Sequence, residues 1–245
     1  MNYIRSPYSM PLVVKNLLII NGVCFLATML LKSSLGIDLY KIFGLHYFGS
    51  ELFKPWQIFT YLFMHGDFTH LFFNMFALWI FGSTIENVWG SKRFMNYYLI
   101  CGLGAGLIQM IVLVVRISML KRNMQPDEVE YVIANGLEIW NQGKNYSHQL
   151  YGDLNKAINM ATVGASGSVF GLLLAFGMMF PDSKIYIYFL LPIKAKWFVI
   201  IYGAIELFYG VSGTQSGVAH FAHLGGMLFG FLLIRYWKSK FKSEE

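Results

Sequence analysis

The stretch GASGSVFGLLLAFGMMF, residues 164–180, decides the fold, because it sets Ser166 at the start of an apolar helix. A second stretch, AHFAHLGGMLFG at residues 219–230, opens another apolar helix with His220 and His223. Ionisable side chains are expensive inside a membrane and are functional there by default. A serine with a histidine is the minimum equipment for nucleophilic catalysis, so Ser166 and His223 together indicate a reaction in the membrane.

The composition is that of an integral membrane protein. Of the 245 residues, 56% are hydrophobic and only 13% are charged, which is far too apolar for a soluble domain. Apolar stretches long enough to cross about 30 Å of hydrocarbon recur along the whole chain, so we expect an all-α membrane protein with a single polytopic domain over residues 1–245. The sequence predicts six spans, at about 12–31, 69–88, 94–115, 166–180, 196–212 and 219–237.

Basic residues predict the orientation of these spans. Lysine and arginine gather in cytoplasmic flanks, and here they border the spans on one side: Arg5, Lys15, Lys92, Arg93, Lys184, Lys194, Lys196, Arg235, Lys238, Lys240 and Lys242. Both termini are therefore expected in the cytoplasm. The net charge of +6 indicates attraction to anionic lipid headgroups, and we expect no nucleic-acid binding.

The ends of the first span and the cysteines add little. Arg5 and Lys15 precede this span, but no small-residue cleavage site follows, so we interpret it as a retained helix and not as a cleaved signal peptide. Cys24 and Cys101 fall within apolar helices, where a thiol behaves as a small hydrophobe. No disulfide or zinc framework is visible, and we expect no metal and no cofactor.

Two long connections are expected on the outer side. Residues 32–69 are rich in aromatic residues and broken by glycine and proline, which favours a segment lying in the membrane interface. Residues 116–161 form an insertion, in which 127–140 is a plausible amphipathic helix preceded by Pro126. This helix is expected either to contact substrate or lipid on the outer leaflet or to be an accessory spacer.

Small residues predict how the two catalytic candidates meet. Gly167 and Gly171 form one GxxxG face, and Gly226 with Gly230 forms another, each beside a candidate catalytic residue. Such faces let helix backbones approach closely, which would bring His223 to Ser166. Free N–H groups at the helix start beside Ser166 would be aimed at developing negative charge.

A third polar group lies in the second span, in MHGDFTHLFFN at residues 64–74. His70 and Asn74 are four residues apart and share a helix face. Their side chains could donate hydrogen bonds to an oxyanion, although an isolated asparagine in a membrane more often forms a hydrogen bond that holds two helices together.

These motifs resemble those of the rhomboid intramembrane serine proteases. They are His-x-x-x-x-His-x-x-x-Asn from His65 to Asn74, Gly-x-Ser-Gly around Ser166, and Ala-His-x-x-His-x-x-Gly-x-x-x-Gly from Ala219 to Gly230. The resemblance covers about residues 55–237, and the outer insertion at about 116–161 lies within this range. It implies a six-transmembrane-helix rhomboid bundle with cytoplasmic termini.

The resemblance also implies roles for single residues. Ser166 would be the nucleophile and His223 the general base, a dyad with no carboxylate, while His70, Asn74 and the Ser166 amide would form the oxyanion hole. Phe170 would orient the imidazole, and His65 and Glu86 would have structural roles. The full set of supporting residues is Phe170, Gly164, Gly167, Gly226, Gly230, His65 and Glu86. Glu86 lies about 24 Å along the helix from His70, which is too remote for chemistry.

Two departures limit the resemblance. The chain has Trp56-Gln57 where the family often has Trp-Arg, so the anchoring of that loop is expected to differ. The insertion at 116–161 is much larger than in compact six-helix members and leaves the substrate-facing rim open to question.

Other hydrolytic chemistries fit less well. His220 lies three residues before His223 and invites a metal interpretation, but no His-Glu-x-x-His occurs. An aspartyl mechanism needs two embedded carboxylates, and Glu206 is the lone candidate; we expect it to pack against polar groups of the bundle interior or to reach a helix end. The sequence after Ser166 also lacks the final glycine of a G-x-S-x-G nucleophile elbow.

The sequence therefore predicts a serine endopeptidase acting on transmembrane protein substrates, near the outer side and in contact with membrane lipids. Its competitor is a rhomboid-like noncatalytic protein that binds transmembrane clients, and a transporter is disfavoured because no paired half-length helices are visible. Residues 211–218 have the composition of a mobile cap over the dyad. The lack of a targeting presequence and the compact body favour a bacterial plasma membrane.

Overall fold

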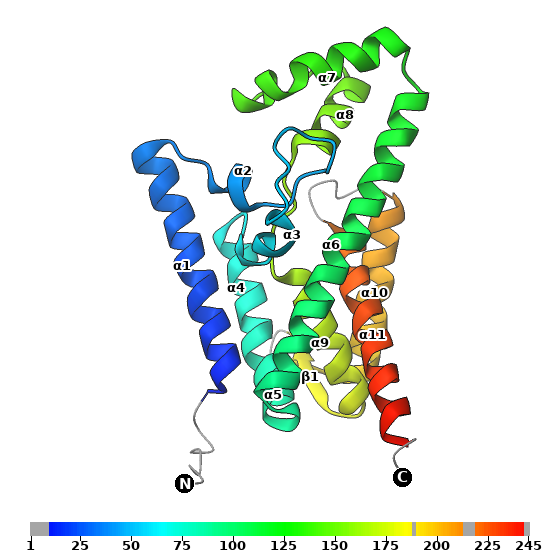
Figure 1. Ribbon diagram of the computed structural model, residues 1–245. Coiled ribbons are helices and arrows are strands. Elements are labelled where there is room, and N and C mark those ends of the chain that lie inside the picture. The colour runs from blue at the N-terminus through cyan, green and yellow to red at the C-terminus, as the bar shows by residue number, and fades with distance from the viewer. Residues whose placement is uncertain (1–9, 188–189, 213–218, 243–245) are drawn as a thin grey trace.

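The computed structural model describes residues 10–187, 190–212 and 219–242, with the backbone alone for Ile187 and 240–242. The long helices run along one axis (Figure 1). In chain order the elements are α1 (Leu12–Leu35), α2 (Leu39–Phe43), α3 (Gln57–Thr60), η1 (Tyr61–Phe63), α4 (Phe68–Ala77), η2 (Leu78–Gly82), α5 (Ser83–Trp89), α6 (Ser91–Arg122), α7 (Pro126–Asn141), α8 (Gln149–Asn159), α9 (Ser166–Met179), β1 (Lys184–Ile187), β2 (Leu191–Lys194), α10 (Ala195–Ser212) and α11 (His220–Lys242).

A helix covers each of the six stretches that the sequence assigns to spans. Four described helical segments are long and apolar enough to cross a membrane: α1, the continuous α4–η2–α5 from Phe68 to Trp89, α6 and α10. Of the two remaining helices, α9 is apolar but has only 14 residues. The other, α11, has 23 residues and carries both histidines of the second motif. The protein is an all-α membrane protein, apart from the hairpin described next.

A short β-hairpin joins α9 to α10 and was not expected from the sequence. Strands β1 and β2 pair antiparallel, with Lys184 opposite Lys194 and Ile185 opposite Ile193. The carboxylate of Asp182 holds this end of the bundle through ion pairs with Lys194 at 3.0 Å and Lys196 at 3.1 Å. These are exposed pairs, which contribute little to stability.

The core lies where α6, α9 and α11 pack on one another. On α6 it contains Phe94, Tyr97, Tyr98 and Cys101, all fully buried, against Leu172 and Ala175 of α9. The Tyr97 hydroxyl donates to the Gly171 carbonyl at 2.8 Å, and the Ser168 hydroxyl donates to the Tyr98 carbonyl at 2.7 Å. Ser168 therefore fastens α9 to α6 and does not face the catalytic candidates.

The outer connections form a layer at one end of the bundle. Helix α6 extends to Arg122 and leads into α7 and α8, which lie at the end opposite to the start of α1 and the end of α11 (Figure 1). The helix expected at 127–140 is confirmed as α7, with Pro126 in its first turn and a capping box between Gln125 and Glu128. Helix α8 was not expected; it packs on α7 and α6 around Val132 and Leu154.

Candidate active site

The chain reaches Ser166 through an extended segment held by backbone hydrogen bonds. Leu45 and Thr162 exchange two of them, at 2.9 and 2.8 Å, and the Gly164 amide donates to the Tyr61 carbonyl at 3.0 Å. Gly164 has φ of +126°, and a Cβ there would come within 2.8 Å of the His70 ring. Only glycine fits this conformation and this close contact. The turn at Gly164 leads the chain into α9, which begins two residues later.

Helix α9 begins at Ser166, and its start is open to an anion. The preceding residue, Ala165, provides no side-chain cap, and the first intrahelical bond runs from the Val169 amide to the Ala165 carbonyl. The N–H groups of the first turn have no carbonyl one turn earlier to bind, and the helix dipole adds to their positive potential. The amide of Ser166 thus lies beside its own hydroxyl in a region suited to negative charge.

His223 comes from the first turn of α11 and contacts Ser166 directly. Its Nε2 lies 2.9 Å from Ser166 Oγ, which is a hydrogen-bond distance, and the residue is 8% exposed. Residues 166 and 223 lie 57 positions apart in the chain, so this contact depends on the packing of α9 against α11. The structure brings together the two residues that the sequence motifs single out.

The glycine faces make that packing close. A Cβ added at Gly226 would overlap the Gly167 carbonyl, and one at Gly171 would approach the Gly226 carbonyl to 3.2 Å. Gly230 instead faces Tyr97 of α6. Gly226 therefore lies at the α9–α11 crossing, and Gly230 serves the contact of α11 with α6. Gly167 and Gly171 lie between both neighbours, because a Cβ at either would meet α6 first, at Ala105 and at Cys101.

Phe170 lies against the imidazole of His223. The two rings are stacked, with centroids 4.2 Å apart and planes 6° apart. Tyr202 of α10 also stacks on Phe170, with centroids 5.3 Å apart. One turn beyond Ser166, Phe170 thus limits the ring rotation of His223.

A carboxylate also contacts this imidazole, which corrects the expectation of a dyad with no carboxylate. Glu206 of α10 is 6% exposed, and its Oε2 lies 2.8 Å from Nδ1 of His223 and 2.7 Å from Nδ1 of His220. The inward position of Glu206 agrees with the sequence, which left its partner open. Its signal was the single carboxylate in an otherwise apolar helix.

The oxyanion candidates lie in the first two turns of α4. His70 follows Asp67, whose carboxylate caps α4 by accepting from the His70 amide at 2.8 Å, and the His70 ring faces Gly164. Asn74 is 6% exposed, and its Nδ2 donates to the His70 carbonyl at 2.8 Å. That bond uses one of the two amide hydrogens of Asn74 and leaves the other for a ligand.

His65 is buried next to this group. It is 1% exposed, and its ring lies 5.1 Å from that of His70. Burial, followed by the nearby His70, lowers the pKa of His65 to about 3, so the ring is neutral at physiological pH. Its carbonyl accepts from the Tyr40 hydroxyl at 2.7 Å, which ties the loop before α4 to α2.

Glu86 lies far from these residues and fastens the start of α1. Its two carboxylate oxygens accept from the amides of Val13 at 3.0 Å and Val14 at 2.9 Å, and Oε1 also accepts from the Ser91 hydroxyl at 2.6 Å. Pro11, at the N-cap position of α1, supplies no side-chain cap, so a carboxylate from another helix satisfies the free N–H groups. This contact is structural.

Gln57 anchors the first outer connection where the family often has arginine. The residue is fully buried; its amide nitrogen donates to the carbonyls of Leu52, Ile42 and Lys41, and its oxygen accepts from the amides of His46 and Lys54. A neutral amide can both donate and accept, whereas arginine only donates. The loop therefore uses a different anchor.

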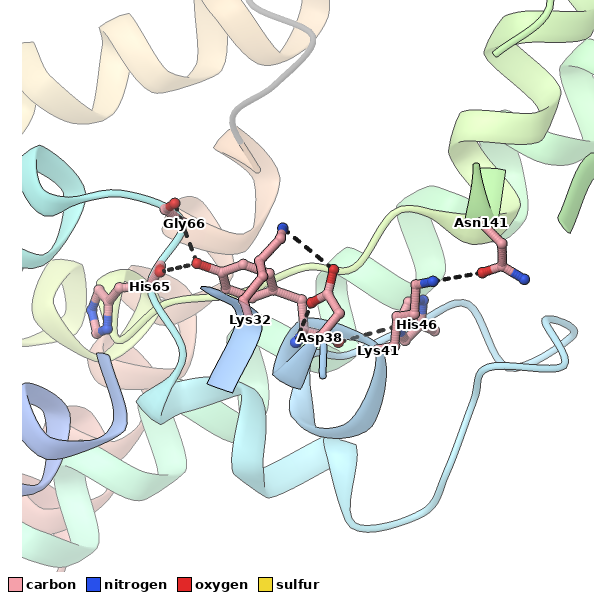
Figure 2. Close-up of polar contacts among 8 residues, drawn as sticks. Lys32, Asp38, Lys41, His46, His65, Gly66 and Asn141 are labelled. Carbon is pink, nitrogen blue, oxygen red and sulfur yellow. Dashed lines mark hydrogen bonds and ion pairs between the residues drawn. The ribbon is translucent and has the colours of Figure 1, made fainter. Parts of the chain in front are cut away.

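The outer rim of the site is polar. The Tyr40 hydroxyl donates to the carbonyls of His65 and Gly66, as the dashed lines in Figure 2 show. In the same group Lys32 pairs with Asp38, and Lys41 donates to Asn141 of α7. Burial, with Asp38 and Asp67 nearby, raises the pKa of Tyr40 in this group. A cavity of about 250 Å³ lies here, between the first outer connection and the insertion, lined in part by Gly66, Trp140 and Val163. The expected cap at 211–218 lies largely outside the described residues.

Comparisons with known proteins show what the chain is similar to. Residues 15–245 match the family described as "Eukaryotic integral membrane protein (DUF1751)". The chain is 30% identical to "Rhomboid-like protein 11, chloroplastic" of Arabidopsis thaliana over 78% of its own length and 55% of that protein's. It is 26% identical to "Rhomboid protein 1, mitochondrial" of Saccharomyces cerevisiae, over 69% and 38%. "Rhomboid protease AarA" of Providencia stuartii is 25% identical, over 78% and 59%.

These comparisons bear on extent and location. The chain spans between 38% and 59% of the length of these three relatives. The matched family is described as eukaryotic, and two of the relatives are named for the chloroplast and the mitochondrion. The expectation of a bacterial plasma membrane is therefore not supported, and what stands is an integral membrane protein.

Proposed function

The chain belongs to the rhomboid family of membrane proteins, and we propose that it is an active intramembrane serine endopeptidase with Ser166 as nucleophile and His223 as general base. The observation that carries this proposal is the 2.9 Å contact between Ser166 Oγ and His223 Nε2. A serine hydroxyl is a weak nucleophile until an adjacent base takes its proton. The printed name of the Providencia relative, a protease, points the same way.

The reaction follows from this pair. Ser166 Oγ bonds to the carbonyl carbon of the scissile peptide while its proton passes to His223 Nε2. The imidazolium then gives that proton to the leaving amine as the C–N bond breaks, which leaves an acyl-enzyme on Ser166. In the second half, His223 takes a proton from water as the water oxygen bonds to the acyl carbon; the bond between that carbon and Ser166 Oγ then breaks, the proton passes to Oγ, and the carboxylic acid product leaves.

The oxyanion of each tetrahedral intermediate needs donors fixed in advance. We assign them to the Ser166 amide at the start of α9, the free amide hydrogen of Asn74 and the His70 ring. The open helix start and the approach of His70 to Gly164 support this assignment. Preorganised donors of this kind are typically worth about 10²–10³-fold each in kcat.

The substrate class follows from the buried setting. The substrates are transmembrane proteins, cut in or near a membrane segment. A helix already satisfies its own carbonyls, so the cut segment must offer extended backbone, and cleavage favours small or helix-breaking residues. Helix α9 is much shorter than α6 and begins beside the middle of α6, not beside its end. This position supports a catalytic serine below the outer surface.

The proposed topology has six spans and cytoplasmic termini in one domain, with the site opening to the outer side. The basic residues near the start of α1 and the end of α11 would then face anionic lipid headgroups. Helices α7 and α8 would form the outer rim, where they could contact the substrate or the outer leaflet. Occupation of one end of the bundle by both of those termini supports this arrangement (Figure 1).

The test is cleavage by the purified full chain in detergent. The probe is a recombinant single-span membrane protein whose segment carries small and helix-breaking residues near its outer end. We expect cleavage by the wild type and none by Ser166→Ala or His223→Ala, with a fluorophosphonate adduct on Ser166 detected as a mass shift. Ser168→Ala, two residues away, is the matched serine control and retains cleavage.

The competing function is noncatalytic binding of transmembrane clients. Capture of the probe without cleavage, together with no adduct on Ser166 under conditions that label other serine hydrolases, would favour it. Cleavage that persists in Ser166→Ala would contradict the assigned nucleophile.

A further inference from the structure

Glu206 is a carboxylate in a helix that otherwise turns large apolar side chains outward. On α10, Trp197, Ile200 and Phe208 are exposed, whereas Glu206 is 6% exposed. An ionised carboxylate in hydrocarbon is costly unless it is paired or hydrogen-bonded. Its retention in the bundle interior therefore depends on the groups that it contacts there.

Those groups are two imidazoles that share one carboxylate oxygen. Glu206 Oε2 accepts from Nδ1 of His220 at 2.7 Å and from Nδ1 of His223 at 2.8 Å. An ionised carboxylate only accepts, and a neutral imidazole has one N–H, so both rings carry their proton on Nδ1. On His223 this leaves Nε2 with a lone pair, directed at Ser166 Oγ at 2.9 Å. The contact with Glu206 thus selects the tautomer that a general base needs.

We propose that Glu206 is the positioning residue for His223, so that the site is a Ser166–His223–Glu206 triad with His220 as a second donor on the same carboxylate. This inference rests on the proposed peptidase function. When Ser166 gives its proton to Nε2, the proton on Nδ1 stays on the ring, and Glu206 lies against the imidazolium that forms. No proton moves to Glu206, and its negative charge offsets the positive charge created inside the bundle.

His220 holds the carboxylate from the other side. It lies one turn before His223 on α11, and its ring packs 5.6 Å from that of Tyr209 on α10. Its Nε2 is buried and has no hydrogen-bond partner in the described part of the chain. Because only Nδ1 of this buried ring is hydrogen-bonded among residues 10–187, 190–212 and 219–242, His220 is placed to support Glu206.

The same three residues could also be considered as metal ligands, because their donor atoms lie within 4.8 Å of one another. The separations favour shared protons. Two donors bound to one tetrahedral zinc at about 2.0–2.1 Å lie about 3.3 Å apart, which is longer than the observed 2.7 and 2.8 Å. A metal on Nδ1 would also leave the proton of His223 on Nε2, where it could not accept from Ser166.

The test compares Glu206→Gln with wild type in steady-state cleavage by the detergent-purified full chain. Glutamine keeps the volume but removes the charge and the obligate acceptor. We expect kcat to fall by about 10²–10⁴-fold with KM little changed, as for loss of the carboxylate from a serine triad. Glu206→Asp, which keeps the charge, is expected to restore part of kcat, and His220→Asn to cause a smaller fall than Glu206→Gln. Glu51→Gln, the same change at an exposed position, is the matched control.

The outcomes separate this inference from the proposed function. Wild-type kcat in folded Glu206→Gln, with Ser166→Ala inactive, overturns the triad and leaves the peptidase intact. A wild type that never cleaves or labels overturns the proposed function itself. If Glu206→Gln fails to fold, Glu206→Asp decides. Aspartate is one methylene shorter and withdraws the carboxylate from His223, so an unchanged kcat in this variant contradicts a positioning role. Loss of cleavage on chelation, restored by zinc, also overturns the triad.

Discussion

Gly226 of α11 lies directly against the carbonyl group of Gly167 on α9, so close that a Cβ at position 226 would overlap it. Gly167 follows the candidate nucleophile, and Gly226 lies three residues after the candidate base. The spacing between the two catalytic side chains is therefore set by two residues that have no side chain. Small residues commonly set helix approach in this way in membranes.

Gly226→Ala is expected to separate α9 from α11 and to lengthen the contact between Ser166 and His223. Overpacking of this kind typically lowers stability by about 1–3 kcal/mol, and a misplacement of about 1 Å lowers catalytic rates about 10²-fold. Melting temperature and kcat measure the two effects. Gly22→Ala on α1 is the control, because a Cβ there meets nothing within 4 Å. A Gly226→Ala protein with wild-type kcat would contradict this account of the spacing.

Phe170→Leu is expected to lower kcat without large loss of stability. The ring is stacked on His223 at 4.2 Å and 6°, and aromatic stacking is worth about 0.5–1.5 kcal/mol beyond area burial, or about 2- to 10-fold in rate if it holds the reactive orientation. Phe176→Leu, on the same helix but in contact with Phe81 and Phe180 and not with His223, is the control. Equal kcat losses in both variants would show that helix packing, and not the stack on His223, is responsible.

The sequence predicted the helices and the contact between Ser166 and His223 well, because both have local signals. Long apolar runs predict spans, and the glycines beside Ser166 and His223 predict a close crossing. The carboxylate of Glu206 was noticed, yet its contact with His223 was not, since it joins residues 17 positions apart on different helices. No periodicity within one helix encodes the rotation of α10 that turns Glu206 inward.

Other features were overlooked or only partly recognised in the sequence. Gln57 was seen only as a departure from the family pattern, because three of its five partners are backbone carbonyls, which every sequence has. Helix α8 and the hairpin were overlooked although both have a signal: Leu150, Leu154 and Ile158 recur at helical spacing, and residues 185–191 form a run of β-branched, aromatic and leucine residues. The π-helical turn η2, within the second span, has no sequence mark.

Gln57→Ala is expected to loosen the first outer connection. It would leave three carbonyls and two amides around position 57 without their partner, and one unsatisfied buried polar group costs about 1–3 kcal/mol. We expect a lower melting temperature and faster proteolysis within residues 45–60. Gln142→Ala, at an exposed position after α7, is the control. Unchanged proteolysis in Gln57→Ala would argue against an anchoring role.

Glu86→Ala is expected to lower stability while leaving the chemistry intact. The carboxylate caps the amides of Val13 and Val14, and loss of a cap costs about 0.5–2 kcal/mol. The melting temperature should fall, and kcat per fluorophosphonate-labelled molecule should equal that of wild type. Ser91→Ala removes the hydroxyl partner of Glu86 but keeps the cap, so it should be milder. A large fall in kcat per labelled molecule would point to a role of Glu86 in the site.

Acid is expected to destabilise the fold through His65. Burial lowers its folded-state pKa to about 3, whereas the unfolded chain has a histidine pKa of about 6.5. Below about pH 6.5 the unfolded state binds the extra proton, so stability falls as the pH is lowered, by about 1.4 kcal/mol per unit down to about pH 3. The difference between pH 7 and pH 5 is then about 2 kcal/mol.

Because other groups titrate as well, the measurement is the pH dependence of the melting temperature in wild type minus that in His65→Phe. His148→Phe, at an exposed position, should leave the wild-type slope between pH 7 and 5 unchanged. Equal slopes in wild type and His65→Phe would mean that His65 is charged or exposed in the folded protein.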